Sequence, residues 1–346
     1  MKPILLITMG DPAGIGAEVT VKALAHPETR EGCLPVVVGD AAPIRDALRF
    51  TSSALKLRII GAPEDARGED GTLELIDLGK LGGQPYEPGK VSALCGEAAF
   101  SYVTYAIDRC MKGKAMGVAT APLNKEAMHL AGHMYSGHTE IFADYTGTKN
   151  YAMLLMSGAL RVIHCTTHVS MREACDLIKT DKVLATIRLA QEALTMLGMP
   201  RGRIGVAGLN AHASENGLFG HEEADAISPA IERARAEGID ADGPVPPDTV
   251  FVKAAGGVYD IVVAMYHDQG HIPLKLFGFR MDPATGLFAS MSGINTTIGL
   301  PIIRTSVDHG TAFDRAGKNT SNEMSMVEAI TTAVKMFPYY EAKRHG

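Results

Sequence analysis

Three short apolar runs in this chain each lead into a histidine, and this recurrence restricts the fold more than any other feature. Each run has the length and the β-branched content of a buried strand. The histidines are His267, His168 and His212, which follow residues 261–265, 161–165 and 203–209. Because ligands of an open α/β sheet bind beyond the carboxyl ends of its parallel strands, the three imidazoles are expected at one edge of such a sheet.

The rest of the chain alternates strand-like and helix-like stretches, which predicts an α/β fold with a largely parallel sheet. Residues 151–165 are expected to form a hairpin that turns at Ser157 and Gly158, and residues 238–248 a proline-rich loop. Residues 266–275 are expected to be a polar loop after their strand. With 346 residues, 46% of them hydrophobic, the chain is long enough for two lobes.

Charge and cysteine content narrow the class of protein. A formal net charge of -6 argues against nucleic acid or an anionic membrane as the main partner. No apolar stretch approaches the roughly 20 residues of a membrane span, and no export signal is apparent at the start. The five cysteines form no C-x-x-C pair, which favours free thiols in a reducing compartment. We therefore expect a soluble, cytoplasmic protein.

The three histidines are candidates for a catalytic metal site, because three neutral imidazoles around a cation leave one position open. Taken singly, each is more often a structural histidine than a ligand. A glycine-rich turn over residues 10–16 links a predicted strand to a predicted helix, where a backbone can approach a phosphate or cofactor. It is not G-x-G-x-x-G, and a tight connection without a ligand is the alternative.

A second set of residues offers donors to an anion. Arginine, lysine and a helix N-terminus suit a phosphate or carboxylate, whereas surface ion pairs and plain helix capping are the alternatives. The set comprises Lys275, Arg304, Asn295 and the pair His138 and Thr139. Lys125 also follows a predicted strand. Late in the chain, His309, Gly310 and Asp314 form a polar loop that is a candidate for holding a cofactor.

Taken together, several motifs resemble the 4-hydroxythreonine-4-phosphate dehydrogenase family almost end to end. They are TMGDPAGIG at 8–16, GHTE at 137–140, TTH at 166–168, GLNAH at 208–212, YHDQG at 266–270 and RTSVDHGTA at 304–312. Residues 120–126, 215–220, 270–275 and 311–314 are more similar to the branch acting on 4-phosphothreonate or 4-phosphoerythronate. More distantly, the chain resembles isopropylmalate and isocitrate dehydrogenases, which implies two α/β/α lobes with a cleft between them.

The resemblance implies a homodimer whose active site takes ligands from both subunits. It assigns residues 1–130 and 300–346 to a cofactor-side lobe and residues 131–299 to a lobe for metal, substrate and dimerisation. The implied metal ligands are His168, His212 and His267, and the implied substrate ligands are His138, Thr139, Lys275, Asn295 and Arg304. The implied cofactor residues are Gly10, Asp11, Gly14, His309, Gly310, Thr311 and Asp314. Asp268 and Lys125 are the candidates for the proton acceptor.

The implied reaction is a metal-dependent oxidative decarboxylation of 4-phospho-D-threonate or 4-phospho-D-erythronate to dihydroxyacetone phosphate and carbon dioxide. NAD is the expected hydride acceptor, with NADP as the alternative. Zinc is the expected metal, with magnesium, manganese and cobalt as alternatives. Ala211 and Ser214 stand where the family often has Pro and Gly, and the segment from Arg280 to Gly293 is longer than usual, which leaves the substrate open.

Four other functions compete with this one. Two keep the fold: a 4-phosphohydroxy-L-threonine dehydrogenase of pyridoxal phosphate synthesis, and a dehydrogenase of a cyclic cis-dihydrodiol carboxylate. A hydrolase or aldolase with a three-histidine metal site would need no nicotinamide. A non-catalytic metal-binding protein would leave the anion-binding set unexplained. Thermal protection by NAD separates the dehydrogenases from the other two.

Overall fold

Two compact units make up the chain. The computed structural model describes residues 2–281, 283, 288–291 and 293–345. The first unit combines Met1–Thr148 with Leu300–Arg344, and the second is Lys149–Gly299. Residues 131–148 thus group with the first unit, whereas the resemblance had placed them in the second lobe. The functional assignment of the two lobes stays a prediction.

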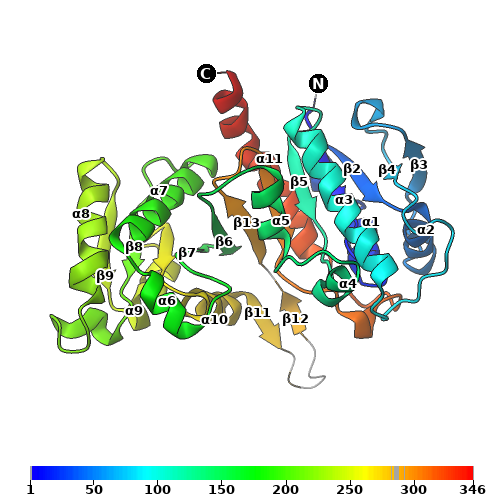
Figure 1. The fold of residues 1–346 in the computed structure, drawn as a ribbon. Coiled ribbons are helices and arrows are strands. Elements are labelled where there is room, and N and C mark those ends of the chain that lie inside the picture. The colour runs from blue at the N-terminus through cyan, green and yellow to red at the C-terminus, as the bar shows by residue number, and fades with distance from the viewer. Residues whose placement is uncertain (1, 282, 284–287, 292, 346) are drawn as a thin grey trace. The chain divides into compact units, whose positions relative to one another are not determined.

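The first unit is built on parallel strands. Their order is β3-β4-β2-β1-β5-β14, and every described pair is parallel (Figure 1). The strands are β1 (Ile4–Thr8), β2 (Leu34–Gly39), β3 (Lys56–Ile60), β4 (Thr72–Asp77), β5 (Gly117–Thr120) and β14 (Ile303–Val307). Strands β1, β2, β5 and β14 are almost wholly buried, as expected of strands covered on both faces, although β14 includes the polar residues 304–306. Neighbouring β1, β5 and β14 all end at the same edge.

The first unit also contains helices. They are α1 (Gly16–Ala23), α2 (Ala41–Phe50), α3 (Ala93–Met111), α4 (Lys125–Leu130), α5 (His138–Tyr145) and α11 (Met324–His345). Two begin at a side-chain cap: Ser92 Oγ accepts the N–H of Cys95 at 3.2 Å, and Asn124 Oδ1 accepts that of Ala127 at 2.8 Å. A Cβ on Gly96 of α3 would lie 2.0 Å from the carbonyl oxygen of Ala127, so only glycine allows α4 this close.

The second unit has a mixed sheet with the order β13-β6-β7-β10-β8-β9. Its strands are β6 (Ala152–Ser157), β7 (Leu160–His164), β8 (Ile204–Ala207), β9 (Ala241–Val245), β10 (Ile261–Ala264) and β13 (Ile294–Ile298). Strands β13, β6 and β7 pair antiparallel, and β7, β10, β8 and β9 pair parallel. The expected hairpin at Ser157 is confirmed. The expected proline-rich loop over 238–248 is wrong in part, because Ala241–Val245 pairs with β8 at the sheet edge, where Pro244 is tolerated.

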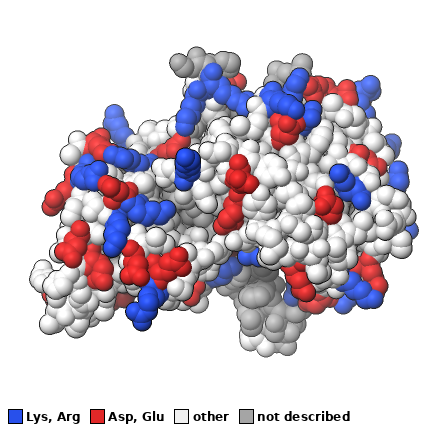
Figure 2. Space-filling view, in the orientation of Figure 1, with Lys and Arg blue, Asp and Glu red and all other residues white. Residues whose placement is uncertain are grey.

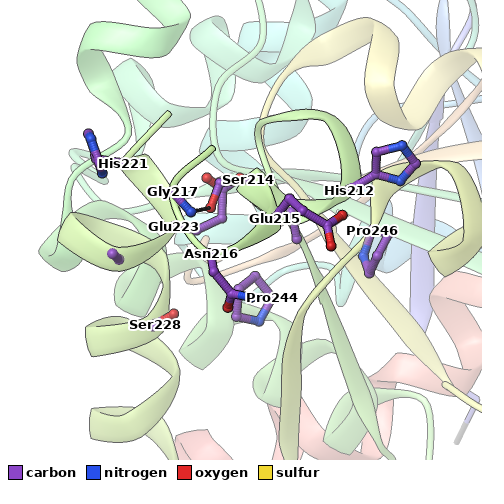
Figure 3. A pocket seen from close by; sticks show the side chains of 12 residues that line it. His212, Ser214, Glu215, Asn216, Gly217, His221, Glu223, Ser228, Pro244 and Pro246 are labelled. Atoms are coloured by element: carbon purple, nitrogen blue, oxygen red, sulfur yellow. Dashed lines mark hydrogen bonds between the residues drawn. The ribbon is translucent and has the colours of Figure 1, made fainter. Parts of the chain in front are cut away.

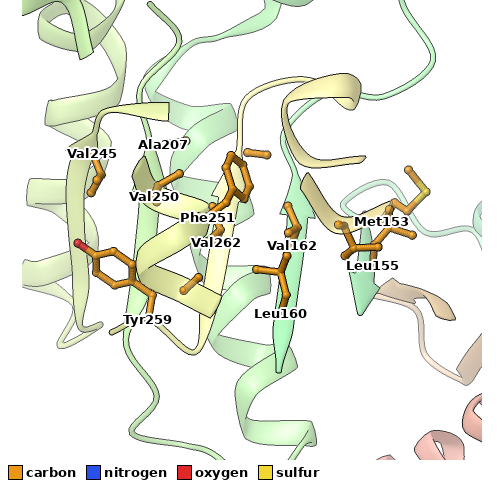
Figure 4. Packing of buried hydrophobic residues seen from close by; sticks show 13 residues of the cluster. Met153, Leu155, Leu160, Val162, Ala207, Val245, Val250, Phe251, Tyr259 and Val262 are labelled. Carbon is orange, nitrogen blue, oxygen red and sulfur yellow. The ribbon is translucent and has the colours of Figure 1, made fainter. Parts of the chain in front are cut away.

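The second-unit helices are α6 (Met171–Leu177), α7 (Thr180–Met196), α8 (Ser228–Ala236), α9 (Pro247–Ala255) and α10 (His267–Gly278). Helix α10 replaces the polar loop that was expected after β10. Gly270 and Pro273 lower the helical propensity there, but tertiary packing overrides it. Side chains from β6, β7, β10 and α9, among them Leu155, Val162 and Phe251, pack into one apolar cluster (Figure 4). This cluster fixes the strand ends from which the histidines project.

Beyond these elements, β11 (Phe279–Met281) and β12 (Phe288–Met291) form an antiparallel pair. The long segment from Arg280 to Gly293 lies partly outside the described residues, so its role stays a prediction. On the face shown in Figure 2, acidic and basic side chains are interspersed, in keeping with the modest net charge of -6. Among the described residues, no helix combines the length and the apolar content needed to cross a membrane.

Candidate functional site

Three loops of the first unit meet beyond the ends of β1, β5 and β14. The N–H of Asp11 donates to the carbonyl oxygen of Pro122 at 2.9 Å, and the N–H of Ile15 donates to that of Thr311 at 3.0 Å. Gly10 has φ +74°, and a Cβ there would lie 2.2 Å from the Pro122 oxygen. The structure thus brings the predicted cofactor residues Gly10, Asp11 and Gly14 beside Thr311. The others, His309, Gly310 and Asp314, lie on the same late loop as Thr311.

Asp11 is a buried acid with one carboxylate oxygen that can still accept a hydrogen bond. Its Oδ1 accepts the N–H of Ala13 at 2.8 Å, while its shielded Oδ2 has no hydrogen-bond partner among the described residues. Burial raises the pKa of this carboxyl to about 6, although the Ala13 hydrogen bond works in the opposite direction. An acidic oxygen of this kind fits a ligand hydroxyl, such as the ribose hydroxyl of a nicotinamide dinucleotide. The polar groups of these loops are therefore compatible with that cofactor.

Asp11→Asn is expected to gain stability relative to the wild type as the pH rises. Between the ordinary pKa of 3.8 and the folded value of about 6, the folded state binds more protons than the unfolded state. The wild type therefore loses unfolding free energy over this window, by about 3 kcal/mol in total. Urea denaturation of both proteins at pH 4 and pH 7.5 would measure the difference. Exposed Asp70→Asn serves as the control, and parallel pH dependence of Asp11→Asn and wild type would contradict the prediction.

Four residues predicted to take part in catalysis or substrate binding lie around the start of α5. Arg304 on β14 is only 3% exposed, its Nη2 donates to Thr120 Oγ1 at 3.2 Å, and its Cζ lies 5.8 Å from the Phe142 ring centre. Burial lowers the pKa of Arg304 to about 9 against the opposing charge of Glu140, so the guanidinium stays cationic at neutral pH. The pKa of His138 is held well below its usual range, chiefly by burial and secondarily by the positive charge of Arg304. A neutral imidazole thus lies beside a buried cation.

Lys125 belongs to the same region. Its Cε is 3.8 Å from where a Cβ on Gly137 would be, and Gly137 caps α5, whose first turn contains His138 and Thr139. The first N–H groups of a helix and its macrodipole favour a bound anion. The structure therefore brings Arg304, His138, Thr139 and Lys125 together around one helix N-terminus.

The second unit gathers histidines around α10. The ring centres of His168 and His267 are 6.0 Å apart, and Nδ1 of His267 is 2.7 Å from Asp268 Oδ1. Two imidazoles that share a Zn²⁺ at about 2.1 Å have ring centres roughly 5 to 6 Å apart, so this pair fits a metal ion. Lys275 lies two helical turns beyond His267, with its Nζ 4.7 Å from the Phe279 ring centre. Asn295 Nδ2 on β13 donates to Met153 Sδ at 2.9 Å.

His212 is placed differently. It is exposed and lies in the loop after β8, where His212 through Asn216 are all left-handed, with φ between 47° and 66°. Buried Glu223 fixes the start of this loop, since its Oε1 accepts the N–H groups of Leu209 and Asn210 at 2.8 Å each. His212 lines a cavity of about 620 Å³ together with Ser214, Glu215, His221 and others (Figure 3). Within this one chain, the described residues contain no group of three His, Cys, Asp or Glu side chains arranged for a metal ion.

Three residues near these sites were missed or given no role. His271 stacks on His267, buried His164 packs against His271, and Glu223 holds the loop of His212. The signal for His271 was its spacing of four residues from both His267 and Lys275, which places all three on one helix face. That signal was lost because α10 was expected to be a loop. For Glu223, no pattern in the sequence predicts its hydrogen bonds to the backbone of Leu209 and Asn210.

Comparison with known proteins adds relatives over nearly the whole chain. The sequence pattern that describes the pyridoxal phosphate biosynthetic protein PdxA matches residues 31–333. A D-threonate 4-phosphate dehydrogenase from Cupriavidus necator is 48% identical over 96% of this chain and 97% of its own length.

Two solved structures extend the comparison. The 4-hydroxythreonine-4-phosphate dehydrogenase from Klebsiella pneumoniae is 45% identical, covers 97% of this chain and 98% of its own, and has a TM-score of 0.84. A terephthalate 1,2-cis-dihydrodiol dehydrogenase from Burkholderia xenovorans is 29% identical over 97% of this chain and 98% of its own, with a TM-score of 0.65.

Proposed function

Because the chain belongs to the PdxA family of pyridoxal phosphate biosynthetic proteins, we propose that it is an NAD-linked dehydrogenase of a phosphorylated 3-hydroxy acid. The family expected from the motifs is thereby confirmed, as is the α/β class with largely parallel strands. The proposed substrate is 4-phospho-D-threonate or 4-phospho-D-erythronate, and the proposed products are dihydroxyacetone phosphate and carbon dioxide. Kinship with a D-threonate 4-phosphate dehydrogenase favours this branch.

The observation that carries the proposal is the buried cation at the start of α5. Arg304 is almost fully shielded and remains charged at neutral pH, beside neutral His138 and the positive end of the helix dipole of α5. A phosphate suits such a group because it carries negative charge and several acceptor oxygens that match a guanidinium. Lys275 and Asn295 of the second unit are the further proposed substrate ligands.

The proposed metal ligands are His168 and His267 of one subunit, with His212 supplied by the partner of a homodimer. This division is supported by the ring contact between His168 and His267, together with the lack of a three-residue metal group among the described residues of one chain. A divalent cation bound there would lower the pKa of the substrate hydroxyl and stabilise the enolate that decarboxylation generates. Asp268 accepts the Nδ1–H of His267 at 2.7 Å, which orients Nε2 as the ligating nitrogen.

The proton acceptor and the cofactor site follow from the first unit. With Asp268 engaged by His267, Lys125 in its neutral amine form is the proposed group that takes the hydroxyl proton and becomes an ammonium, because it lies beside the start of α5. The loops that carry Gly10, Asp11, Gly14 and residues 309–314 are proposed to hold NAD. Their tight mutual hydrogen bonds give a cofactor a preformed binding surface.

Two related substrates are the alternatives. A 4-phosphohydroxy-L-threonine differs from the threonate by an ammonium in place of the C2 hydroxyl, and the Klebsiella pneumoniae relative carries that substrate in its name. A cis-dihydrodiol carboxylate would use Arg304 for its carboxylate, and the Burkholderia xenovorans structure supports that candidate.

NADH formation by the purified protein with added divalent metal would decide between these substrates. We expect turnover with 4-phospho-D-threonate or 4-phospho-D-erythronate, and little with 4-phosphohydroxy-L-threonine. Turnover of only the last substrate would move the chain to the pyridoxal phosphate branch. If none of the three forms NADH and a cis-dihydrodiol carboxylate is oxidised instead, the proposal of a phosphorylated substrate is refuted.

A further inference from the structure

A stack of imidazoles lies behind the proposed metal ligand His267. His271, one helical turn later on α10, stacks on the His267 ring with centres 3.6 Å apart and planes 12° apart. His164, at the end of β7, packs against His271 with ring centres 4.8 Å apart. His164 is 2% exposed and His271 is 9% exposed, so both rings are buried. None of the proposed chemistry uses either of them.

Two carbonyl groups fix the tautomers of the buried rings. Nδ1 of His271 lies 2.9 Å from the carbonyl oxygen of His267, and Nδ1 of His164 lies 3.2 Å from that of Met153. A carbonyl oxygen only accepts, so each Nδ1 carries the hydrogen and each Nε2 is a bare acceptor. Both rings are therefore held in one orientation by the backbone.

Gly270 allows the two rings to approach. A Cβ at this position would lie 2.3 Å from Nε2 of His164, so any other residue would force the His164 ring or the helix to shift. The glycine sits between His267 and His271 on the helix. Its absence of a side chain thus lets His164 support the stack from the sheet side.

His271 contacts His267 at two points. Its ring covers one face of the His267 ring, and its Nδ1–H donates to the carbonyl of the same residue. The stacked ring blocks the side-chain rotamers of His267 that would point toward His271. The hydrogen bond fixes the backbone from which the His267 side chain projects. An aliphatic residue of similar volume would supply packing but no hydrogen bond.

We propose that His271, supported by His164, is a positioning residue for the metal ligand His267. The inference rests on the metal site proposed above. His267 would then have two orienting partners. Asp268 holds the edge of its ring through a hydrogen bond, and His271 covers the face of the ring. Outer partners that orient a ligating histidine typically change metal affinity by about 10- to 100-fold when they are removed.

Three variants test this role by metal binding rather than by turnover. His271→Leu removes both contacts, His271→Phe keeps a flat ring without the N–H, and His129→Leu replaces an exposed histidine of the first unit as the control. Co²⁺ affinity, measured by competition with a chelator, is expected to fall about tenfold in His271→Leu and less in His271→Phe. The visible absorption of bound Co²⁺ is expected to change in His271→Leu alone. A folded His271→Leu with wild-type affinity and spectrum would overturn the proposal.

A metal-free measurement separates failure of the stack from failure of the metal site. In the apo protein, ring currents from His271 are expected to shift the His267 ring protons in nuclear magnetic resonance spectra. The shift should be lost in His271→Leu and kept in His271→Phe. Its absence from the wild type would overturn the positioning role. A wild type that shows the shift but binds no Co²⁺ would instead refute the metal site.

Discussion

His212→Ala is expected to abolish turnover while leaving the protein folded. The side chain is exposed and lies outside the apolar cluster of the second unit, so its removal costs little unfolding free energy. If His212 completes the metal site, its loss removes metal stabilisation of about 4 kcal/mol, which is roughly a thousandfold in rate. Turnover, metal content and thermal unfolding should be measured together. His221→Ala, which alters another exposed histidine lining the same cavity, is the matched control.

Mixed dimers reveal which subunit supplies His212. A subunit with His212→Ala keeps His267, and a subunit with His267→Ala keeps His212. If His212 acts across the interface, a dimer of the two contains one intact site, and mixing the inactive variants restores part of the activity. If all three histidines act within one chain, mixing restores none. Near-normal activity of folded His212→Ala, with unchanged metal content, would remove His212 from the site altogether.

Arg304→Ala is expected to raise the KM for a phosphorylated substrate roughly 10- to 100-fold, because hydrogen bonds to charged groups contribute about 1.5–3 kcal/mol. The metal should be retained, since the proposed metal ligands belong to the other unit. Steady-state kinetics with 4-phospho-D-threonate, alongside metal analysis, would measure both effects.

Two further variants separate charge from geometry at this position. Arg304→Lys keeps a cation but loses the forked donors that match a phosphate, so its KM is expected to lie between those of the wild type and Arg304→Ala. Arg304→Met retains length and packing over Phe142 without charge, and it guards against a purely structural effect. An unchanged KM in all three variants would place the anion site elsewhere.

Apolar patterning predicted most of the strand framework. Strands β7 and β10 are largely buried and pair in parallel, which is why His168 and His267 lie near each other as expected. Helix α10 was not predicted because Gly270 and Pro273 are locally unfavourable for a helix. The close contacts that require a glycine at position 270 come from β7, which is distant in the sequence. Edge strand β9 was not predicted because its glycine and proline are typical of turns.

His212 shows where sequence reasoning about the site stops. It also follows a parallel strand, and on that ground it was expected with His168 and His267. That joint site stays a prediction. The structure shows that residues 212–216, which include no glycine, form a left-handed turn after β8, and that the buried carboxylate of Glu223 fixes the start of this loop. Such a conformation costs about 1–2 kcal/mol per residue and has no local sequence signal. The partner proposed to receive His212 is likewise invisible in one sequence.

The split of the first unit along the chain has a consequence for synthesis on the ribosome. Strand β5 is complete by Thr120, yet its neighbour β14 begins at Ile303, after the whole second unit has been translated. Until then one edge of β5 has no strand to pair with, and such edges recruit other chains. The second unit, by contrast, is continuous from Lys149 to Gly299 and has its full set of strands by β13. We therefore expect the nascent N-terminal segment to be more prone to association with other chains than the second unit while translation continues.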